Sequence, residues 1–251
     1  MANYSILFSP TGGTRRVAEI LTQALGGSWQ EVNLCREIGE MDLGPEDVCL
    51  VSVPSYGGRV PFLATERLGS IHGNGARAVL VCVYGNRAWE DTLTELQDTL
   101  EHQGFRCAGA VSAVAEHTMF RQFAAGRPDG DDAEQLREFA LKLARRLAED
   151  SWPPLKLEGS HGTYKHFPGA GFKPQVLPVC TGCGICAAEC PIGAIPLEEP
   201  GRTDLDKCIG CLRCVAVCPE KARQLDPAAV ERALPMFTPR LSGHKENYLF
   251  L

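Results

Sequence analysis

A cysteine motif that occurs twice restricts how this chain can fold. The segment CTGCGICAAECPIGAI begins at Cys180, and CIGCLRCVAVCPEKAR begins at Cys208. All four cysteines, and the proline after the fourth, coincide when the two copies are aligned. So dense a set of thiols in a chain expected to stay in a reducing compartment indicates metal binding rather than disulfides. Two copies are also too few for a solenoid, which needs three or more repeats.

The spacing within each copy indicates the kind of metal site. Each copy reads C-x2-C-x2-C-x3-C-P, a spacing of iron–sulfur ligands. Three thiolates cover one face of a cubane, and the proline turns the chain away, so the fourth cysteine serves the other cluster. The predicted ligands are Cys180, Cys183, Cys186 and Cys218 for cluster one, and Cys208, Cys211, Cys214 and Cys190 for cluster two.

Zinc is the alternative metal, because paired C-x2-C units also occur in zinc sites. A zinc ribbon uses two such pairs, however, and not three close cysteines followed by Cys-Pro in each copy. A three-iron cluster is disfavoured because neither copy lacks a cysteine. Residues 173–226 resemble the bacterial two-cluster ferredoxins, which implies two [4Fe–4S] clusters that transfer single electrons. A purely structural role for the clusters stays open.

The first 150 residues alternate between two apolar patterns. Short, nearly continuous apolar runs are typical of parallel strands buried on both faces. They occupy Tyr4–Phe8, Trp29–Leu34, Val48–Val53, Ala78–Val83 and Ala110–Ala115. Helical patterns lie at residues 17–25, 60–70, 89–100 and 136–147, and Asp131 with Glu134 predicts a capping box for the last of them. This alternation predicts a doubly wound α/β domain.

Three loops follow the first, third and fourth predicted strands. SPTGGT begins at Ser9 and leads into a predicted helix, whose N-terminus favours an anion. It has no lysine, so it is not a nucleoside-triphosphate P-loop, and it lacks the G-x-G-x-x-G order of a dinucleotide site. PSYGGRVP occupies residues 54–61 and YGNRAWED residues 84–91. All three lie at the carboxyl ends of strands, where open α/β sheets bind ligands.

In these loops the chain resembles the flavodoxins, and over residues 4–226 it resembles the flavodoxin–ferredoxin fusion proteins of anaerobes. The resemblance implies a flavodoxin-like five-stranded parallel sheet followed by a small α+β ferredoxin-like domain. It also implies FMN, and not FAD, because no adenosine-binding element follows. The implied FMN residues are Ser9, Thr11, Gly12, Gly13 and Thr14 for the phosphate, and Pro54, Ser55, Tyr56, Gly57, Gly58, Tyr84, Gly85, Asn86 and Arg87 for the ring.

Several of the ring assignments have an alternative. Tyr56 is the implied stacking partner of the ring, yet both loop tyrosines also suit ordinary packing. Arg87 has the alternative of a surface ion pair with Glu90 or Asp91. If Arg59 or Arg87 lies beside the flavin, its positive charge would stabilise the anionic reduced ring, in contrast to the acidic surroundings common in flavodoxins.

The predicted organisation has four parts. Residues 1–150 form the flavodoxin-like domain, and residues 151–172 form a connector rich in proline and glycine. Residues 173–226 form the ferredoxin domain. The tail, residues 227–251, ends in NYLFL, and we expect its apolar end to pack on one of the domains.

Other reactive side chains have simpler interpretations. Cys49 and Cys82 lie inside apolar strands and are expected to be small buried hydrophobes. His161 and His166 of the connector are expected to be solvated and not to ligate a metal. A nucleophilic pair of a cysteine with His117 is a disfavoured alternative. The segment around His117, residues 117–130, could cap the flavin or be a plain ordered loop.

Composition excludes some classes of function. The net charge is −6 and there is no basic run, which argues against a nucleic-acid binder. No apolar run is long enough to span a bilayer. The N-terminus lacks the pattern of a secretory signal, so a cytoplasmic location is expected.

The expected function is electron transfer between two [4Fe–4S] clusters and FMN, with other redox proteins as partners. One alternative is an FMN-dependent reductase of a small organic substrate that receives its electrons through the clusters. Another is a sensor or assembly factor with structural clusters. A small-molecule acceptor and a homodimer are left open, and no nicotinamide site is expected.

Overall fold

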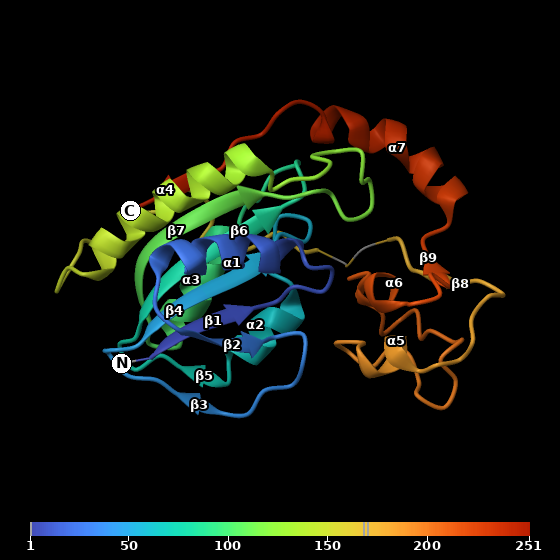
Figure 1. Cartoon of the computed structure of the whole chain (residues 1–251), viewed down its shortest axis with the longest axis horizontal. Coiled ribbons are helices and arrows are strands. Elements are labelled where there is room, and N and C mark those ends of the chain that lie inside the picture. The colour runs from blue at the N-terminus through green and yellow to red at the C-terminus, as the bar shows by residue number, and fades with distance from the viewer. Residues whose placement is uncertain (1, 168, 170) are drawn as a thin grey trace.

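The computed structural model describes residues 2–167, 169 and 171–251, which form two lobes (Figure 1). The larger lobe is built on a central sheet, and the smaller lobe contains the cysteine repeat. Among the described helices, none is both long enough and apolar enough to cross a membrane.

Six strands form the central sheet. They are β1 (Asn3–Leu7), β2 (Trp29–Asn33), β4 (Val48–Pro54), β6 (Arg77–Tyr84), β7 (Arg106–Val114) and β10 (Tyr248–Phe250). Their order is β10-β7-β6-β4-β1-β2. All of these strands except β10 pair in parallel, and they are the strands that the apolar runs predict. When the five parallel strands are numbered along the chain, their order across the sheet is 2-1-3-4-5. This is the order of flavodoxin-like sheets, so the predicted fold class is confirmed.

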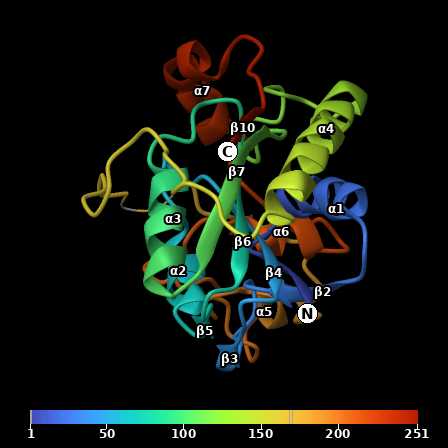
Figure 2. The same ribbon diagram turned by 90° about the vertical axis from the view of Figure 1, so that its left-hand side faces the viewer.

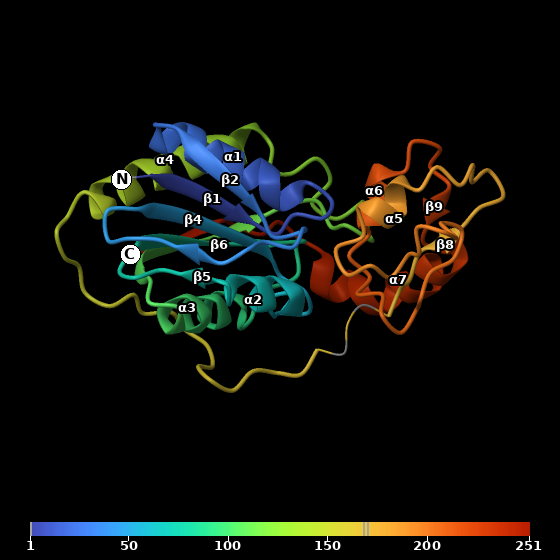
Figure 3. The same ribbon diagram turned by 90° about the horizontal axis from the view of Figure 1, so that it is seen from below.

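Four helices cover the sheet as the periodic apolar stripes predict. α1 (Gly13–Leu25) and α4 (Gly130–Leu147) lie on one face, and α2 (Phe62–Leu68) and α3 (Thr92–His102) on the other (Figures 2 and 3). A two-residue parallel pair, β3 (Met41–Asp42) with β5 (Ile71–His72), extends the lobe beside the sheet.

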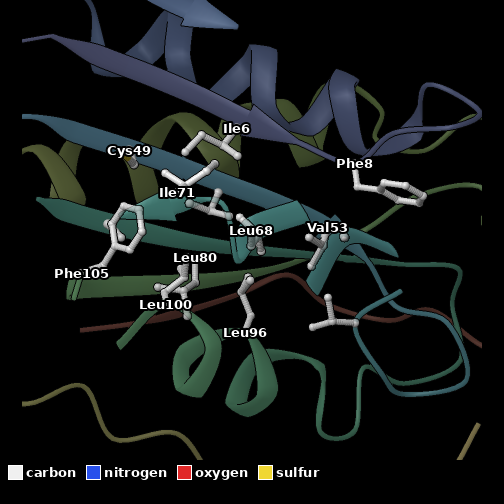
Figure 4. Packing of buried hydrophobic residues seen from close by; sticks show 14 of the residues in the cluster. Ile6, Phe8, Cys49, Val53, Leu68, Ile71, Leu80, Leu96, Leu100 and Phe105 are labelled. Atoms are coloured by element: carbon white, nitrogen blue, oxygen red, sulfur yellow. The ribbon is translucent and has the colours of Figure 1, made fainter. Parts of the chain in front are cut away.

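Each face of the sheet has its own core. Leu68, Leu96 and Leu100 of α2 and α3 pack against Ile6 and Leu80 of the sheet, all fully buried (Figure 4). On the other face, α1 and α4 pack together over the sheet. Cys49 and Cys82 are fully buried in this lobe, as expected, and burial raises the pKa of Cys49 to about 12.

The capping box of α4 differs from the predicted one. The side chain of Asp129 accepts from the backbone N–H of Asp132, and the Asp132 carboxylate accepts from the N–H of Asp129. The predicted pair, Asp131 with Glu134, is therefore wrong by two residues. Asp132 is also held by Arg127, whose Nε donates to its carboxylate at 2.8 Å.

The smaller lobe has little regular structure. β8 (Gln175–Val176) pairs antiparallel with β9 (Arg223–Gln224), and α5 (Ile185–Ala188) and α6 (Arg213–Val217) each follow a pair of cysteines. Both short helices start after a left-handed residue, Gly184 in the first copy and Leu212 at the same place in the second.

Residues 151–167 run along the α2–α3 face of the larger lobe (Figure 3). Asp98 of α3 holds this segment, because its carboxylate contacts His161 Nδ1 at 2.7 Å and also the Tyr164 hydroxyl. The Arg59 guanidinium lies over the Tyr164 ring, 5.0 Å from its centre. His161 is thus paired with a carboxylate, which raises its pKa, rather than simply solvated.

The C-terminal segment returns from the smaller lobe to the larger one. Its helix α7 (Pro227–Leu241) spans the two lobes, and β10 then pairs antiparallel with the edge strand β7 (Figure 1). Neither element was predicted. Pro235 and Pro239 lie inside α7, where proline ordinarily breaks a helix, and β10 is only three residues long.

Candidate functional site

Two hollows in the smaller lobe are lined by the cysteines of the repeat. The first hollow contains Cys180, Cys183, Cys186 and Cys218, and the second contains Cys190, Cys208, Cys211 and Cys214. Each hollow therefore takes three cysteines from one copy of the motif and the fourth from the other copy.

The Cys-Pro turns position the fourth cysteine of each copy. The backbone N–H of Ala194 donates to Cys190 Sγ at 3.2 Å, and that of Ala222 donates to Cys218 Sγ at 3.2 Å. These N–H groups stabilise negative charge on sulfur, as a cluster-bound thiolate requires. Four thiols around a hollow with donors to the sulfurs fit a [4Fe–4S] cluster in each position.

The loop after β1 presents free donors at the start of α1. Ser9 Oγ accepts from the backbone N–H of Arg15, in the first turn of this helix, at 2.9 Å. The backbone N–H groups of Thr11, Gly12, Gly13 and Thr14 donate to none of the described residues. Because these unpartnered N–H groups lie at a helix N-terminus, the loop fits the phosphate of FMN.

The loop after β4 is a tight turn closed by its own backbone. Tyr56 and Arg59 exchange backbone hydrogen bonds, at 2.9 and 3.2 Å, across Gly57 and Gly58, which have φ angles of 62° and 88°. Pro54 ends β4, and the Ser55 hydroxyl accepts from Thr92 Oγ1 at 2.9 Å.

The two glycines of this turn allow close approach of other side chains. A Cβ on Gly57 would overlap the ring of Phe167, and one on Gly58 would overlap the Glu90 side chain. Tyr56 itself packs edge-on against Phe8, with ring centres 6.5 Å apart. Packing of Tyr56, the stated alternative to flavin stacking, is therefore present.

The loop after β6 is engaged by the C-terminal segment. The Tyr84 hydroxyl donates to the carbonyl oxygen of Glu246 at 2.8 Å, and Asn86 Nδ2 donates to that of Gly243 at 2.9 Å. Both side chains are almost fully buried. These two predicted flavin residues thus hold the C-terminal segment with their side chains, and Gly85 packs against His117.

The two terminal nitrogens of the Arg87 guanidinium differ in whether they have a hydrogen-bond partner. Its Nη1 pairs with Glu90 at 2.7 Å, the surface ion pair considered from the sequence. Its Nη2 is buried and has no partner among the described residues. An orphaned guanidinium nitrogen in a predicted flavin loop fits a polar ligand atom there. Arg59 is paired with Glu95 at 2.6 Å, so both of the arginines considered as flavin neighbours have carboxylate partners.

His117 lies beside the same loop. Its Nδ1 accepts from the backbone N–H of Phe120 at 3.1 Å, which places the proton of the neutral ring on Nε2. Burial, together with the nearby charge of Arg87, lowers the pKa of His117 to about 4. The imidazole is therefore a neutral hydrogen-bond donor near neutral pH.

Residues around the second hollow contact the larger lobe directly. Arg213, next to Cys214, donates from Nη1 to the carbonyl oxygen of Pro10 at 3.1 Å. Arg67 of α2 donates to the carbonyl oxygen of Pro191 at 2.6 Å. Glu189, next to Cys190, pairs with Arg213 and with Arg36 of the larger lobe.

The apolar side of this contact is formed by Ile192 and Ile209, which pack against the core of the larger lobe. Tyr56 of the loop after β4 packs against the same core of the larger lobe, and burial raises its pKa. The second hollow, and not the first, thus adjoins the loops implied to bind FMN. The sequence holds no local signal for these contacts.

Comparison with known proteins assigns the smaller lobe. Residues 179–222 match the family of 4Fe-4S dicluster domains. The chain is a flavodoxin-like domain fused to a dicluster ferredoxin domain. The strand order establishes the first half of this fusion, and the family match establishes the second. No curated protein matches the chain.

Solved structures similar to the fusion protein cover its flavodoxin-like domain. A Streptococcus pneumoniae TIGR4 flavodoxin is 19% identical, with 58% of this chain and 99% of that one covered and a TM-score of 0.43. Flavodoxin 1 from Bacillus cereus is 13% identical, with coverage of 58% and 98% and a TM-score of 0.45. Rubredoxin:oxygen oxidoreductase from Desulfovibrio gigas is 16% identical, with coverage of 58% and 36% and a TM-score of 0.42.

Proposed function

We propose that this fusion protein relays electrons between two [4Fe–4S] clusters and FMN and exchanges them with other redox proteins. The observation that carries the proposal is the contact between the second hollow and the loops implied to bind FMN. Arg213 joins the cysteine loop of that hollow to the phosphate loop through Pro10. The order that follows is cluster one, cluster two, FMN.

The chain's residues would bind each cofactor as the sequence predicts. The crossed cysteine sets line the two hollows, and the free N–H groups after Ser9 would bind the phosphate of FMN. When bound, FMN exchanges one or two electrons and each cluster exchanges one, so the set can interconvert single electrons and pairs. The buried orphan Nη2 of Arg87 would donate to the flavin.

Ion pairs and a hydrogen bond join the second hollow to the flavodoxin-like domain. Arg213 is held on one side by Glu189 and on the other by Pro10, and Glu189 is held in turn by Arg36. A guanidinium pre-organised by a carboxylate loses little conformational freedom when it donates across an interface. The network therefore helps to hold the second hollow against the flavodoxin-like domain.

The first hollow is the outer end of the proposed relay. Cys183 is exposed, whereas every cysteine of the second hollow is at least half-buried. Val179, directly before Cys180, and Ile185, directly before Cys186, are 51% and 41% exposed. Apolar residues around an exposed cluster ligand suit a brief encounter with another redox protein.

The test combines cofactor analysis with rapid kinetics on the anaerobic holoprotein. We expect about eight irons per chain, set by two complete motifs, and FMN. A reduced bacterial ferredoxin should reduce the flavin rapidly. Removing the second cluster with Cys211→Ser should slow this step while the flavin stays bound. About four irons, stoichiometric zinc, or flavin reduction that is indifferent to Cys211→Ser would overturn the proposal, and so would turnover of small organic acceptors at rates above protein-to-protein transfer.

A further inference from the structure

A buried guanidinium distinguishes the first hollow from the second. Arg223, in β9, is 2% exposed and lines the first hollow. Its Nε donates to Cys186 Sγ at 3.2 Å, and its Nη1 donates to Thr203 Oγ1 at 2.7 Å. Its Nη2 donates to the carbonyl oxygens of Pro200 and Arg202.

No carboxylate partner is present for this guanidinium among the described residues, unlike Arg59, Arg127 and Arg213. Arginine stays protonated, and an unpaired charge is costly to bury. Carbonyl and hydroxyl oxygens satisfy its N–H groups but do not cancel its charge. Among the groups that Arg223 contacts in the described part of the chain, only the Cys186 sulfur can carry a negative charge, as a thiolate or as a cluster ligand.

The equivalent place in the other copy carries no charge. Aligning CPEKAR with CPIGAI sets Arg223 opposite Ile195, which is 4% exposed and lines the second hollow. The two hollows thus have cysteines at the same positions of the motif. The residue at the position of Arg223 differs, with a guanidinium in the first hollow and an aliphatic side chain in the second.

Other charges near the hollows are placed less favourably. Lys173 contacts the carbonyl oxygen of Cys208, not its sulfur, and is only half-buried. Glu220 lines the first hollow but is exposed, so water screens its charge. Arg213, beside the second hollow, is neutralised by Glu189. Arg223 is the buried cation with a direct contact to a cluster ligand.

We propose that Arg223 raises the reduction potential of the cluster held by Cys180, Cys183, Cys186 and Cys218 above that of the other cluster. The inference rests on the proposed function only in requiring that both clusters are present. A reduced cluster carries one more negative charge than an oxidised one, so a buried cation and a hydrogen bond to its ligand sulfur stabilise the reduced form. The first electron to enter the protein therefore reduces the cluster of the first hollow, which is the outer one in the proposed relay.

The experiment is a potentiometric titration of the anaerobic holoprotein, followed by EPR. The wild type should show two separate one-electron iron–sulfur steps. Arg223→Ile, which copies the residue of the other repeat, should move the upper step down toward the lower one. It should move the lower step by less, because Arg223 donates directly to Cys186, whereas Cys214 of the second hollow only packs near Cys186. Arg223→Lys should move the upper step less than Arg223→Ile does, because the charge remains while the planar fork is lost.

A matched control is Arg202→Gln. The backbone carbonyl of Arg202 accepts from Arg223, but its side chain is 64% exposed, so its charge is screened. This variant should leave both steps unchanged. If Arg223→Ile does not retain its iron, Arg223→Gln serves instead, because it keeps an N–H donor and removes the charge. A single step in the wild type, an unmoved upper step in the variants, or an equal shift in Arg202→Gln would overturn the inference.

This titration needs neither FMN nor a partner protein. A selective shift of the upper step in a protein whose flavin is not reduced through its clusters would support the role of Arg223 and overturn the relay. Unshifted steps with normal flavin reduction would overturn the role of Arg223 alone.

Discussion

Arg213 Nη1 lies 3.1 Å from the carbonyl oxygen of Pro10, and this hydrogen bond links the residue beside Cys214 to the loop before α1. The two residues are far apart in sequence and belong to different domains. Their contact places the second cysteine hollow, and not the more exposed first one, against the loop that offers free N–H groups for a phosphate.

Removing this link should uncouple the two redox domains. In Arg213→Ala we expect iron and FMN contents close to wild type, but flavin reduction through the clusters slowed severalfold, because the second hollow is held less closely. Stopped-flow absorbance with a reduced ferredoxin as donor measures the rate. Arg232→Ala, an exposed arginine of α7, is the control. A wild-type rate in Arg213→Ala would show that Ile192, Ile209 and Arg67 hold the contact unaided.

The crossed cysteine sets predict which cluster each cysteine serves. Cys190→Ser should disturb the cluster of Cys208, Cys211 and Cys214, because Cys190 lines that hollow. Cys180→Ser should disturb the other cluster. EPR of each reduced variant identifies the altered signal. The same signal lost in both variants would mean that Cys190 serves the cluster of its own copy.

Gly12 gives a test of the phosphate loop that leaves the clusters alone. Its φ angle is 96°, which a β-branched residue adopts only with strain, although a Cβ added there would meet no other atom within 4 Å. Gly12→Val should therefore turn the loop N–H groups and reduce FMN content, with iron content unchanged. Gly39→Val is the control, because Gly39 has an ordinary φ angle and open space around it. Full FMN retention in Gly12→Val would place the phosphate elsewhere.

Asn247 should be important for stability because it joins β10 to the rest of the domain. Its Oδ1 accepts from the N–H of Val114 at 2.8 Å, and its Nδ2 donates to Asp132 and Gln135 at 2.8 Å each. Asn247→Ala leaves the buried N–H of Val114 unpaired and removes one hydrogen bond each from Asp132 and Gln135, so it should lower the free energy of unfolding by roughly 2–3 kcal/mol. Urea unfolding measures it, with Lys142→Ala on the exposed side of α4 as the control. A loss no larger than that of Lys142→Ala would contradict this.

His117 should make stability depend on pH. Its pKa is about 4 in the folded protein, against an ordinary value of 6.5, so the unfolded chain binds the proton more readily. The contribution of neutral His117 to the free energy of unfolding is present in full well above pH 6.5 and decreases as the pH falls toward 4. At pH 5 the loss should be about 2 kcal/mol, from the linkage between protonation and unfolding.

The measurement is the difference in unfolding free energy between pH 7 and pH 5, in the wild type and in His117→Gln. The variant should lose less stability over this range, because glutamine keeps an acceptor for the Phe120 N–H and does not titrate. His102→Gln, at an exposed end of α3, should behave like the wild type. Equal losses in the wild type and His117→Gln would mean that His117 is protonated without cost in the fold.

The sequence alone determined the features that depend on local spacing. Apolar runs such as Val48–Val53 predict strands because a strand buried on both faces must be apolar at every position. The cysteine spacing predicts two cluster sites because three thiolates of one short loop can bind one face of a cubane. Loop positions at the carboxyl ends of strands follow from the parallel order, which makes the loop after Ser9 a candidate for binding a phosphate.

Only the tertiary structure decided which distant groups meet. The sequence places Tyr84 and Asn86 in a flavin loop, but their side chains bind the returning C-terminal segment. It shows Arg59 as a cation in the loop of residues 54–61, but not that Glu95 neutralises it. It aligns Arg223 with Ile195 without showing that the guanidinium is buried against Cys186. Periodicity reports how deeply a segment is buried, whereas the partner of a buried charge is set by packing between segments that are remote in the chain.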